Sequence, residues 1–391
     1  MASPLIHVMH VLTDTNVGGA GTLLCNQLAA MDPQSFYFSV ILPRGSRLAE
    51  RIRALKTSCR ILFTDHAADR SDDLRAIGEY LRIFRIHRPD IIHTHAALAA
   101  RIAARLCHTP ALIHTRHCVF PLTARQKSPL YHLVFGAVNH ALSDGTIAVA
   151  KAAQEQLCAL GMKEDRIRVI VNGVSPLRRC TEQEKTALRN ALSIPHDAFI
   201  VGMMARLESY KGQGTLLDAT ARCLGMIDGE RFYVLLCGDG SQKDALTRQA
   251  GALGISDHVR MVGFCEDVAP YYAIMDVNVN ASYGTETSSL ALSEGMSVGV
   301  PAVASAFGGN PAMVQTGVNG LLFPPQDAET LAEALLHLYH DRDALRRLST
   351  GARLFYEQHL TARGMAEQLG AYYKEILAQK KHRIQTSPTL Q

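Results

Sequence analysis

Short apolar runs rich in β-branched residues alternate with segments of helical periodicity along most of this chain, and this alternation most constrains its fold. Such a pattern is typical of parallel sheets covered by helices on both faces. In the first half we predict buried strands at residues 5–12, 36–42, 91–94, 111–115, 146–149 and 168–171. In the second half we predict strands at 200–204, 233–237, 259–262, 277–280, 302–304 and 320–323. The predicted helices include 22–31, 74–84, 130–142, 152–160, 215–224, 243–253, 289–298 and 328–340.

The pattern stops at a polar stretch that begins with Ser175 and then starts again, which indicates two domains. A chain of 391 residues also exceeds what one ordinary core accommodates. We predict two Rossmann-like, doubly wound α/β domains, at 1–174 and 175–362, that face each other across a cleft. A helix at 363–380 is expected to pack back on the first domain, and a polar tail at 381–391 is expected to be disordered. In such folds, ligands bind at the carboxyl ends of the strands.

Composition favours a cytoplasmic protein. The nine cysteines are scattered and form no C-x-x-C pair, so we expect reduced thiols and neither a disulfide framework nor a zinc site. The N-terminus lacks a basic region before its first apolar run, so a signal peptide is not expected. No uninterrupted apolar stretch reaches the length of a membrane span.

Charge is distributed unevenly along the chain. Residues 1–170 hold 20 Lys and Arg against 13 Asp and Glu, whereas the remainder holds 20 against 23. A basic first half predicts an anionic partner such as a membrane surface, a lipid phosphate or a polyanionic acceptor. Nucleic acid is not expected, because the cations are not interleaved with aromatic residues and no binding motif is present.

Two parts of this basic half suggest peripheral contact with an anionic membrane, at its inner face. One holds the clustered cations Arg44, Arg47, Arg51, Arg53 and Lys56, and the other is the apolar segment 130–138, preceded by Arg125 and Lys127. The alternative is that 130–138 is a core helix and that the arginines form a solvated face.

Two carboxylates, Glu286 and Glu294, stand eight positions apart across the start of a predicted helix with Ser288 or Ser289 as its N-cap. A charge in such an apolar helix is costly unless it is paired or faces a ligand. The two glutamates could hold one extended polyhydroxylated ligand at two points, and the free N–H groups of the helix start could hold an anion. This arrangement suggests a nucleotide-sugar site. The alternative is two solvated surface charges.

Arg206 and Lys211 follow the first strand of the second half and precede Gly212, which suits a diphosphate. A glycine-rich turn containing Gly18 and Gly19 follows the first strand of the chain, where a ligand could approach the backbone closely. Its spacing differs from the dinucleotide fingerprint G-x-G-x-x-G, which argues against a nicotinamide-dependent dehydrogenase. Alternatively, the turn is only a tight connection.

Several motifs together resemble retaining glycosyltransferases of family 4, which have the GT-B fold. They are Arg206-Leu-x-x-x-Lys211-Gly, Gly238-Asp-Gly240, the spacing from Glu286 to Glu294, Gly308-Gly309-x-Pro311 and Gly317-x-Asn319-Gly320. The resemblance extends over residues 5–380. It implies transfer of a sugar from a UDP- or GDP-sugar, with retention at the anomeric carbon and without a metal or other cofactor, to a glycan or lipid-linked acceptor in polysaccharide or glycolipid biosynthesis.

The resemblance also implies roles for individual residues. Arg206 and Lys211 would hold the diphosphate, Glu286 the sugar hydroxyls and Glu294 the ribose, while His117 would reach the donor sugar. The full set implied for donor binding is Gly18, Gly19, Arg206, Lys211, Gly240, Glu286, Ser288, Ser289, Leu290 and Glu294. The alternative for His117 is a structural histidine. Ser175, Ala312 and the Thr287-Ser-Ser segment depart from the family pattern, and the last of these leaves the identity of the donor sugar open.

Neither His93-x-His95 nor Asp341-Arg-Asp343 is expected to be a metal site, because the first lacks further ligands nearby and the second lies between two helical stretches, where acids serve as caps. No carboxylate remains as a nucleophile if Glu286 holds hydroxyls, which favours attack of the acceptor on the face that the diphosphate leaves. Two alternatives stay open: a hydrolase or epimerase of the same shape, and an inactive nucleotide-sugar-binding protein.

Overall fold

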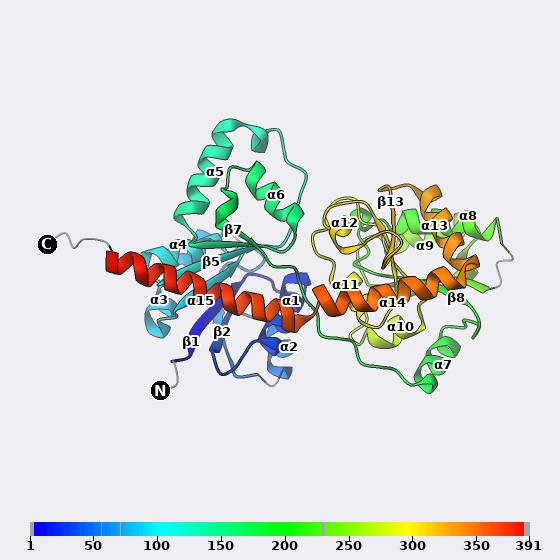
Figure 1. The fold of residues 1–391 in the computed structure, drawn as a ribbon, viewed down its shortest axis with the longest axis horizontal. Helices are drawn as coiled ribbons and strands as arrows, with labels where there is room; N and C mark the ends of the chain where they lie inside the picture. The colour runs from blue at the N-terminus through cyan, green and yellow to red at the C-terminus, as the bar shows by residue number, and fades with distance from the viewer. Residues whose placement is uncertain (1–3, 56, 71, 228–230, 387–391) are drawn as a thin grey trace. The chain divides into compact units, whose positions relative to one another are not determined.

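The computed structural model describes residues 4–55, 57–70, 72–227 and 231–386 (Figure 1). The chain forms two compact units, of which one consists of Met1–Gly173 with Ala362–Gln391 and the other of Val174–Thr361. Each is a parallel sheet between layers of helices, and the predicted pair of Rossmann-like units is confirmed.

In the first unit the described residues form a seven-stranded sheet in the order β3-β2-β1-β4-β5-β6-β7, with every neighbouring pair parallel. The strands are β1 (Ile6–Leu12), β2 (Phe36–Pro43), β3 (Cys59–Thr64), β4 (Ile91–His95), β5 (Ala111–Arg116), β6 (Gly145–Ala148) and β7 (Ile167–Val169). The helices are α1 (Gly19–Ala30), α2 (Leu48–Ala54), α3 (Ile77–His87), α4 (Leu98–Leu106), α5 (Pro129–Ala141), α6 (Lys151–Ala159) and α15 (Ala362–Thr386).

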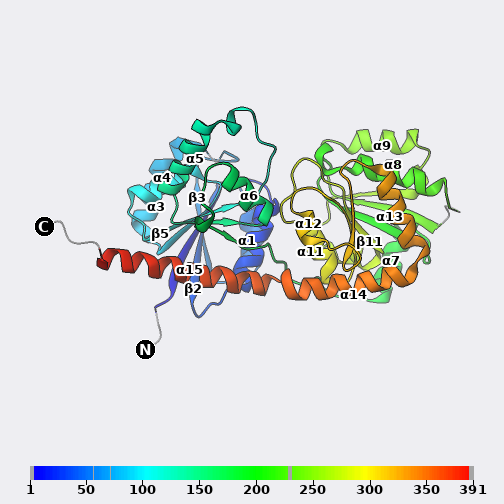
Figure 2. The same cartoon turned by 45° about the horizontal axis from the view of Figure 1, so that its top comes forward.

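Side chains alternate between the two faces of this sheet, and each face has its own core. Val8 and Ile91 pack under α1, α2 and α15, whereas Met9 and Ile92 pack under α3 and α4. Figure 2 shows α15, drawn in red, running along this unit, where it contacts α1.

In the second unit six strands form a parallel sheet in the order β10-β9-β8-β11-β12-β13 within the described residues. The strands are β8 (Phe199–Met204), β9 (Phe232–Cys237), β10 (Val259–Gly263), β11 (Val277–Asn280), β12 (Ala302–Ser305) and β13 (Gly320–Phe323). The helices are α7 (Glu182–Ala191), α8 (Gln213–Leu224), α9 (Lys243–Ala252), α10 (Ala269–Ile274), α11 (Leu290–Ser297), α12 (Asn310–Met313), α13 (Ala328–His340) and α14 (Arg342–His359). The core on one face is closed by α8, α9 and α13.

Both sheets reverse their strand order at one point, between β1 and β4 in the first unit and between β8 and β11 in the second. In doubly wound sheets, the loops on either side of such a point run in opposite directions, and ligands bind between them at the carboxyl edge of the sheet. The predicted site residues of the second unit follow β8, β9 and β11.

The C-terminal region differs from the prediction in one respect. α15 continues to Thr386, so residues 381–386, which we predicted to belong to a disordered tail, are helical. Residues 387–391 of that expected tail lie outside the described residues. Among the helices that the structure describes, none is both long and apolar enough to cross a membrane.

Candidate functional site

The loop after β8 brings Arg206 and Lys211 to either side of Tyr210. Arg206 is exposed, and its Nη2 donates to the Tyr210 hydroxyl at 2.7 Å, while Lys211 Nζ lies 5.8 Å from the centre of the Tyr210 ring. Gly212 ends this loop with a φ of +81°, and a Cβ there would lie 2.2 Å from the Ala281 carbonyl oxygen. Only glycine lets the loop pack this closely on the end of β11.

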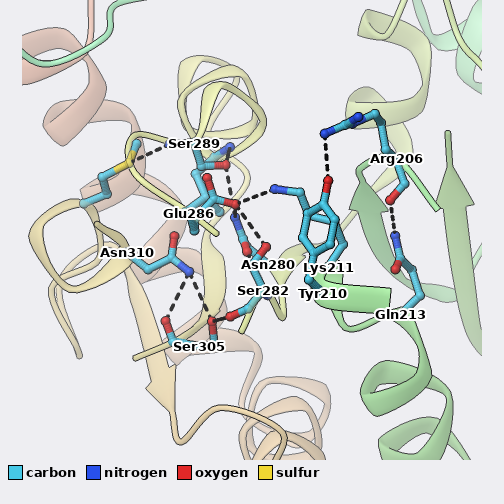
Figure 3. A network of polar contacts seen from close by, with 12 residues as sticks. Arg206, Tyr210, Lys211, Gln213, Asn280, Ser282, Glu286, Ser289, Ser305 and Asn310 are labelled. Atoms are coloured by element: carbon cyan, nitrogen blue, oxygen red, sulfur yellow. Dashed lines mark hydrogen bonds and ion pairs between the residues drawn. The ribbon is translucent and has the colours of Figure 1, made fainter. Parts of the chain in front are cut away.

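Glu286 is buried and fixed through one of its two oxygens (Figure 3). Glu286 Oε2 lies 3.1 Å from Lys211 Nζ and accepts hydrogen bonds of 3.0 Å from Asn280 Nδ2 and from Ser282 Oγ. Glu286 Oε1 accepts no hydrogen bond from any residue that the structure describes. The carboxylate is therefore held in place while one oxygen remains able to accept from a ligand.

A second loop, after β12, supports the backbone beside Glu286. A Cβ on Gly308 would lie 2.0 Å from the Glu286 carbonyl oxygen, and one on Gly309 would lie 1.6 Å from that of Thr287. The Ser305 hydroxyl donates to the Ser282 carbonyl at 2.6 Å and so ties the two loops together. The two glycines of this motif are thus required by close backbone packing.

Helix α11 begins directly after Glu286. Ser289 is the N-cap, since its hydroxyl accepts from the Leu292 N–H at 3.3 Å, and it also accepts at 3.1 Å from Asn280 Nδ2. Leu290 is the first residue of the helix, where backbone N–H groups have no intrahelical acceptor. Such a terminus favours an anion.

The predicted second carboxylate lies in the second turn of α11. Glu294 is half-buried, and its Oε2 lies 3.5 Å from the hydroxyl of Tyr272, which donates to the Ala291 carbonyl at 2.7 Å. Burial raises the pKa of Tyr272 well above its ordinary value, and the nearby Glu294 charge adds to this. Tyr272 therefore stays a hydroxyl donor. Ser288, also predicted at the site, is buried just before the cap.

Gly240 lies in the loop after β9, next to the Arg206 loop. A Cβ on Gly240 would come within 2.4 Å of the Leu207 carbonyl oxygen. The Leu207 N–H in turn donates to the Asp239 carbonyl at 3.0 Å. Gly240 thus lets this loop support the backbone that carries Arg206.

Three of the predicted residues belong to the first unit. Gly18 and Gly19 are exposed at the start of α1, have ordinary negative φ angles, and would have nothing within 4 Å of an added Cβ. His117 follows β5, is half-buried, and its Nε2 lies 2.8 Å from His95 Nδ1. Burial, and to a lesser degree Arg116, lowers the pKa of His117 to about 4.

The side chains of the two motifs that we did not expect to bind a metal, Asp341-Arg-Asp343 and His93-x-His95, have other partners. Asp341 caps α14 by accepting from the Ala344 N–H at 2.8 Å, as predicted for an acid between two helices, and Asp343 pairs with Arg346. His93 and His95 are buried in β4, where the structure brings His10 of β1 beside them. His10 had no signal in the sequence, because its partners are more than 80 residues away.

Asn280 and Ser282, which hold Glu286, were not predicted as site residues. A signal was present, since a buried strand that reads Val-Asn-Val-Asn carries polar side chains that need partners. Tyr210, between the two cations, had no comparable signal.

Comparisons with known proteins cover both units. Residues 17–178 match the family described as Glycosyltransferase Family 4, and residues 184–355 match Glycosyl transferases group 1. D-inositol 3-phosphate glycosyltransferase 1 of Catenulispora acidiphila is 29% identical over 326 residues, which are 78% of this chain and 74% of that protein. The lipopolysaccharide core biosynthesis glycosyltransferase LpsE of Rhizobium meliloti is 31% identical over 226 residues, covering 58% and 62% respectively. The structure of Anabaena HepE in complex with UDP and glucose superposes with a TM-score of 0.80 at 21% identity, over 94% of this chain and 99% of that one.

Proposed function

Because this chain belongs to glycosyltransferase family 4 and has the GT-B fold, we propose that it transfers a sugar from a nucleoside diphosphate sugar with retention of anomeric configuration. One observation carries the proposal. Glu286 is anchored through Oε2 at the point where the sheet order reverses, with Lys211 against it and its Oε1 available for a hydroxyl.

The cations beside Glu286 suit the leaving diphosphate. Arg206 is bound through one guanidinium nitrogen to Tyr210, and its other N–H groups have no partner among the described residues. Lys211 and the start of α11 add a mobile charge and backbone donors. These groups stabilise the negative charge that develops as the bond from the anomeric carbon to the phosphate oxygen breaks. With that charge met by side chains, no metal is needed.

Retention follows from the role of Glu286 as a hydrogen-bond acceptor. A two-step route would need a carboxylate aimed at the anomeric carbon. The contacts of Glu286 Oε2 instead hold this group where it can orient hydroxyls. In the proposed step the acceptor oxygen bonds to the anomeric carbon on the face that the diphosphate leaves, and the acceptor proton passes to the departing phosphate oxygen.

The test measures nucleotide binding and transfer together. Arg206→Ala and Lys211→Ala should each weaken binding of UDP or GDP at least tenfold, because each removes a charge-assisted contact of roughly 1.5–3 kcal/mol. Lys185→Ala is the control, since Lys185 pairs with Glu182 on the surface of α7. UDP is tested first, because Anabaena HepE was crystallised with it.

Three results would contradict the proposal. Unchanged nucleotide affinity in both variants would refute the diphosphate site. Donor breakdown at the same rate with and without acceptor would indicate a hydrolase. Tight donor binding with no transfer to any acceptor would indicate an inactive binding protein.

For the acceptor, we propose a lipid-linked or envelope glycan that the enzyme meets at the inner face of an anionic membrane, through α5. The outer side of α5 carries an apolar stripe, defined by its spacing of three and four residues: Leu130, Leu133, Val134 and Val138. Leu130 and Leu133 are each 71% exposed, so the alternative of a core helix is wrong. The inner side packs through Asn139, which accepts from Arg101 Nη2 at 3.0 Å.

Charge at both ends of the stripe favours an anionic surface as its partner. Exposed Arg125 and Lys127 form the short helix η2 (Arg125–Lys127) directly before α5. At the other end, burial lowers the pKa of His140, and the nearby cations Arg166 and Lys163 lower it further, against an opposing effect of Asp165. An apolar stripe between cations is typical of helices that lie in a membrane interface.

The other basic cluster does not belong to this surface. α2 carries Arg51 and Arg53 between β2 and β3, at the opposite edge of the sheet from α5, and the two helices lie far apart within the unit (Figure 1). Arg44 pairs with Asp65 at 2.5 Å. Lys56 lies outside the described residues. The membrane proposal therefore depends on α5 alone.

A further inference from the structure

The first unit contains a buried group of imidazole rings that the proposed transfer does not explain. We define this histidine stack as His10, His93, His95 and His117. In the sheet His10 of β1 lies beside His93 of β4, and His95 lies beside Thr115 of β5, so these side chains share the face under α1 and α15. His10, His93 and His95 are no more than 3% exposed, and the rings of His93 and His95 stack at 4.5 Å.

Three members of the stack form one continuous chain of hydrogen bonds. His10 Nδ1 lies 3.0 Å from His95 Nε2, and His95 Nδ1 lies 2.8 Å from His117 Nε2. The chain ends at His117 Nδ1, which has no hydrogen-bond partner among the described residues. His93 stands outside it, because its Nδ1 contacts the Tyr373 hydroxyl and its Nε2 contacts Thr115 Oγ1, each at 2.6 Å.

The rings of the chain are neutral at ordinary pH. Burial lowers the pKa of His10 to about 3 and that of His117 to about 4, and it lowers the pKa of His95 well below its usual value. A neutral imidazole has one N–H donor and one acceptor nitrogen. Each ring in the chain must therefore match the direction of its neighbour.

Only two arrangements of the protons satisfy both hydrogen bonds. If His10 Nδ1 donates, His95 Nδ1 also donates, and His117 carries its proton on Nδ1, where it can donate to a ligand. If His117 Nε2 donates, His95 Nε2 donates to His10, and His117 Nδ1 can accept. The free nitrogen of His117 is thus coupled through His95 to a ring in the centre of the sheet.

We propose that His95 and His10 are positioning residues for His117: their hydrogen bonds hold its ring and couple the position of its proton to the tautomers of His95 and His10. This proposal rests on the proposed function, in which His117 contacts the donor sugar. Ring orientation and tautomer matter there, because a hydroxyl of the sugar needs a partner of defined polarity.

A metal ion is the competing occupant of the stack. One ring nitrogen from each of His10, His93 and His95 can be chosen so that the three atoms lie within 4.8 Å of one another. Both nitrogens of His93 and of His95 already have hydrogen-bond partners, and a metal would displace them. The contacts favour the hydrogen-bonded chain.

The first experiment reads the tautomer directly, without needing activity. Long-range ¹H–¹⁵N spectra of the full chain labelled at histidine report which imidazole nitrogen of His117 is protonated, with His117→Phe providing the assignment. We expect one neutral tautomer in the native protein and a mixture of tautomers in His95→Phe, which keeps a ring but removes both nitrogens. His93→Phe is the matched control, since it is equally buried and leaves the chain intact. If His95→Phe does not fold, His10→Phe breaks the other link.

The second experiment is a double-mutant cycle on transfer. His95→Phe should lower kcat at least tenfold, whereas adding it to His117→Phe should change kcat less than twofold, because the chain acts only through His117. Rescue of part of the loss in His95→Gln, which can still donate and accept, would support the proposal.

Four results would overturn it. They are an unchanged His117 tautomer in His95→Phe, independent effects of the two substitutions, full activity of His117→Phe, and binding of one equivalent of Zn²⁺ or Co²⁺ to the native chain with loss of the His95 N–H signal. An unchanged tautomer in the spectra would mean that the chain of hydrogen bonds between the rings is absent. Failure of the proposed function would instead show as no transfer by the native enzyme.

Discussion

The glycines in the motifs predicted for the candidate site are of two kinds: close backbone packing requires some of them and does not require others. Gly309 approaches the Thr287 backbone so closely that a Cβ would collide with it at 1.6 Å. Gly19, at the start of α1, has open space around it and an ordinary backbone conformation. Close packing requires the first glycine but not the second, for which we predict contact with a ligand.

Gly19→Ala should therefore separate binding from stability. Its free energy of unfolding should stay within about 1 kcal/mol of the native value, because alanine is at least as favourable as glycine in a helix. Affinity for donor or acceptor should fall at least fivefold, measured by calorimetry and kinetics. Gly309→Ala is the contrasting variant, expected to lose about 1–3 kcal/mol of stability through overpacking. Unchanged kinetics in Gly19→Ala would mean that the turn is only a tight connection.

The buried histidines predict an acid-sensitive first unit. His10 has a pKa of about 3 in the folded state, so below pH 6.5 the unfolded chain binds a proton that the folded chain does not. Stability is therefore complete above this pH and falls as the pH drops toward 3. Between pH 7 and 5 one such histidine costs about 2 kcal/mol. Urea unfolding followed by circular dichroism should show a pH dependence smaller by that amount in His10→Phe, with pH 8 as the baseline. An identical dependence in both proteins would contradict the assignment.

At the scale of helices and strands, burial decided which predictions succeeded. The central strands are runs of apolar residues buried on both faces, and their positions were predicted within a few residues, as for β8 and β11. β3 was missed, because as an edge strand it is half-exposed and carries Arg60. α4 was also missed, although its residues follow a clear helical apolar period.

The N-cap of α11 shows how far local chemistry can go. A serine before an apolar run predicts a helix start, and the structure places Ser289 there. The contacts that fix Glu286 could not be predicted in the same way, because Lys211 comes from 75 residues earlier in the chain. Positions along the sequence were predictable, whereas pairings depended on the order of strands in the sheet.

The exposed stripe of α5 gives a prediction for a whole helix. The native enzyme should sediment with anionic vesicles at low ionic strength and be released by salt, since each cation near such a surface contributes about 1 kcal/mol. Leu130→Glu combined with Leu133→Glu should weaken this binding at least tenfold. Leu106→Glu is the matched control, because Leu106 is an exposed leucine, 56% exposed, on α4 of the same unit. Failure of the native enzyme to bind anionic vesicles at low salt would leave a soluble acceptor as the alternative.

At the scale of the whole molecule, the order of motifs along the chain was enough to predict the family and the two-unit fold. The residues predicted for the site are divided between the units, with Gly18, Gly19 and His117 in one and Arg206, Lys211 and Glu286 in the other. A sequence pattern places each residue on its own unit. The histidine stack could not be predicted from such a pattern, because the stack forms only where β1, β4 and β5 lie side by side in the sheet.

Chelation tests the proposed source of charge stabilisation in the complete enzyme. Transfer should persist in excess EDTA, because Arg206 and Lys211 are proposed to take the part that a divalent ion plays elsewhere. The measurement is the transfer rate before and after dialysis against chelator, with a metal-dependent glycosyltransferase assayed in parallel. Loss of activity that Mg²⁺ or Mn²⁺ restores would contradict the proposal.

The path of the chain has a consequence for how the protein is made. Val174–Thr361 is one continuous segment, whereas the first unit is completed only by α15, whose buried residues Met365, Ala366, Leu369, Tyr372, Tyr373 and Ile376 fill the core over β1. During synthesis the segment translated second is thus the first to have all of its parts. The strands translated first wait, with one face covered only in part by α1 and α2, until α15 leaves the ribosome. We expect chaperones that bind nascent chains to act during this interval.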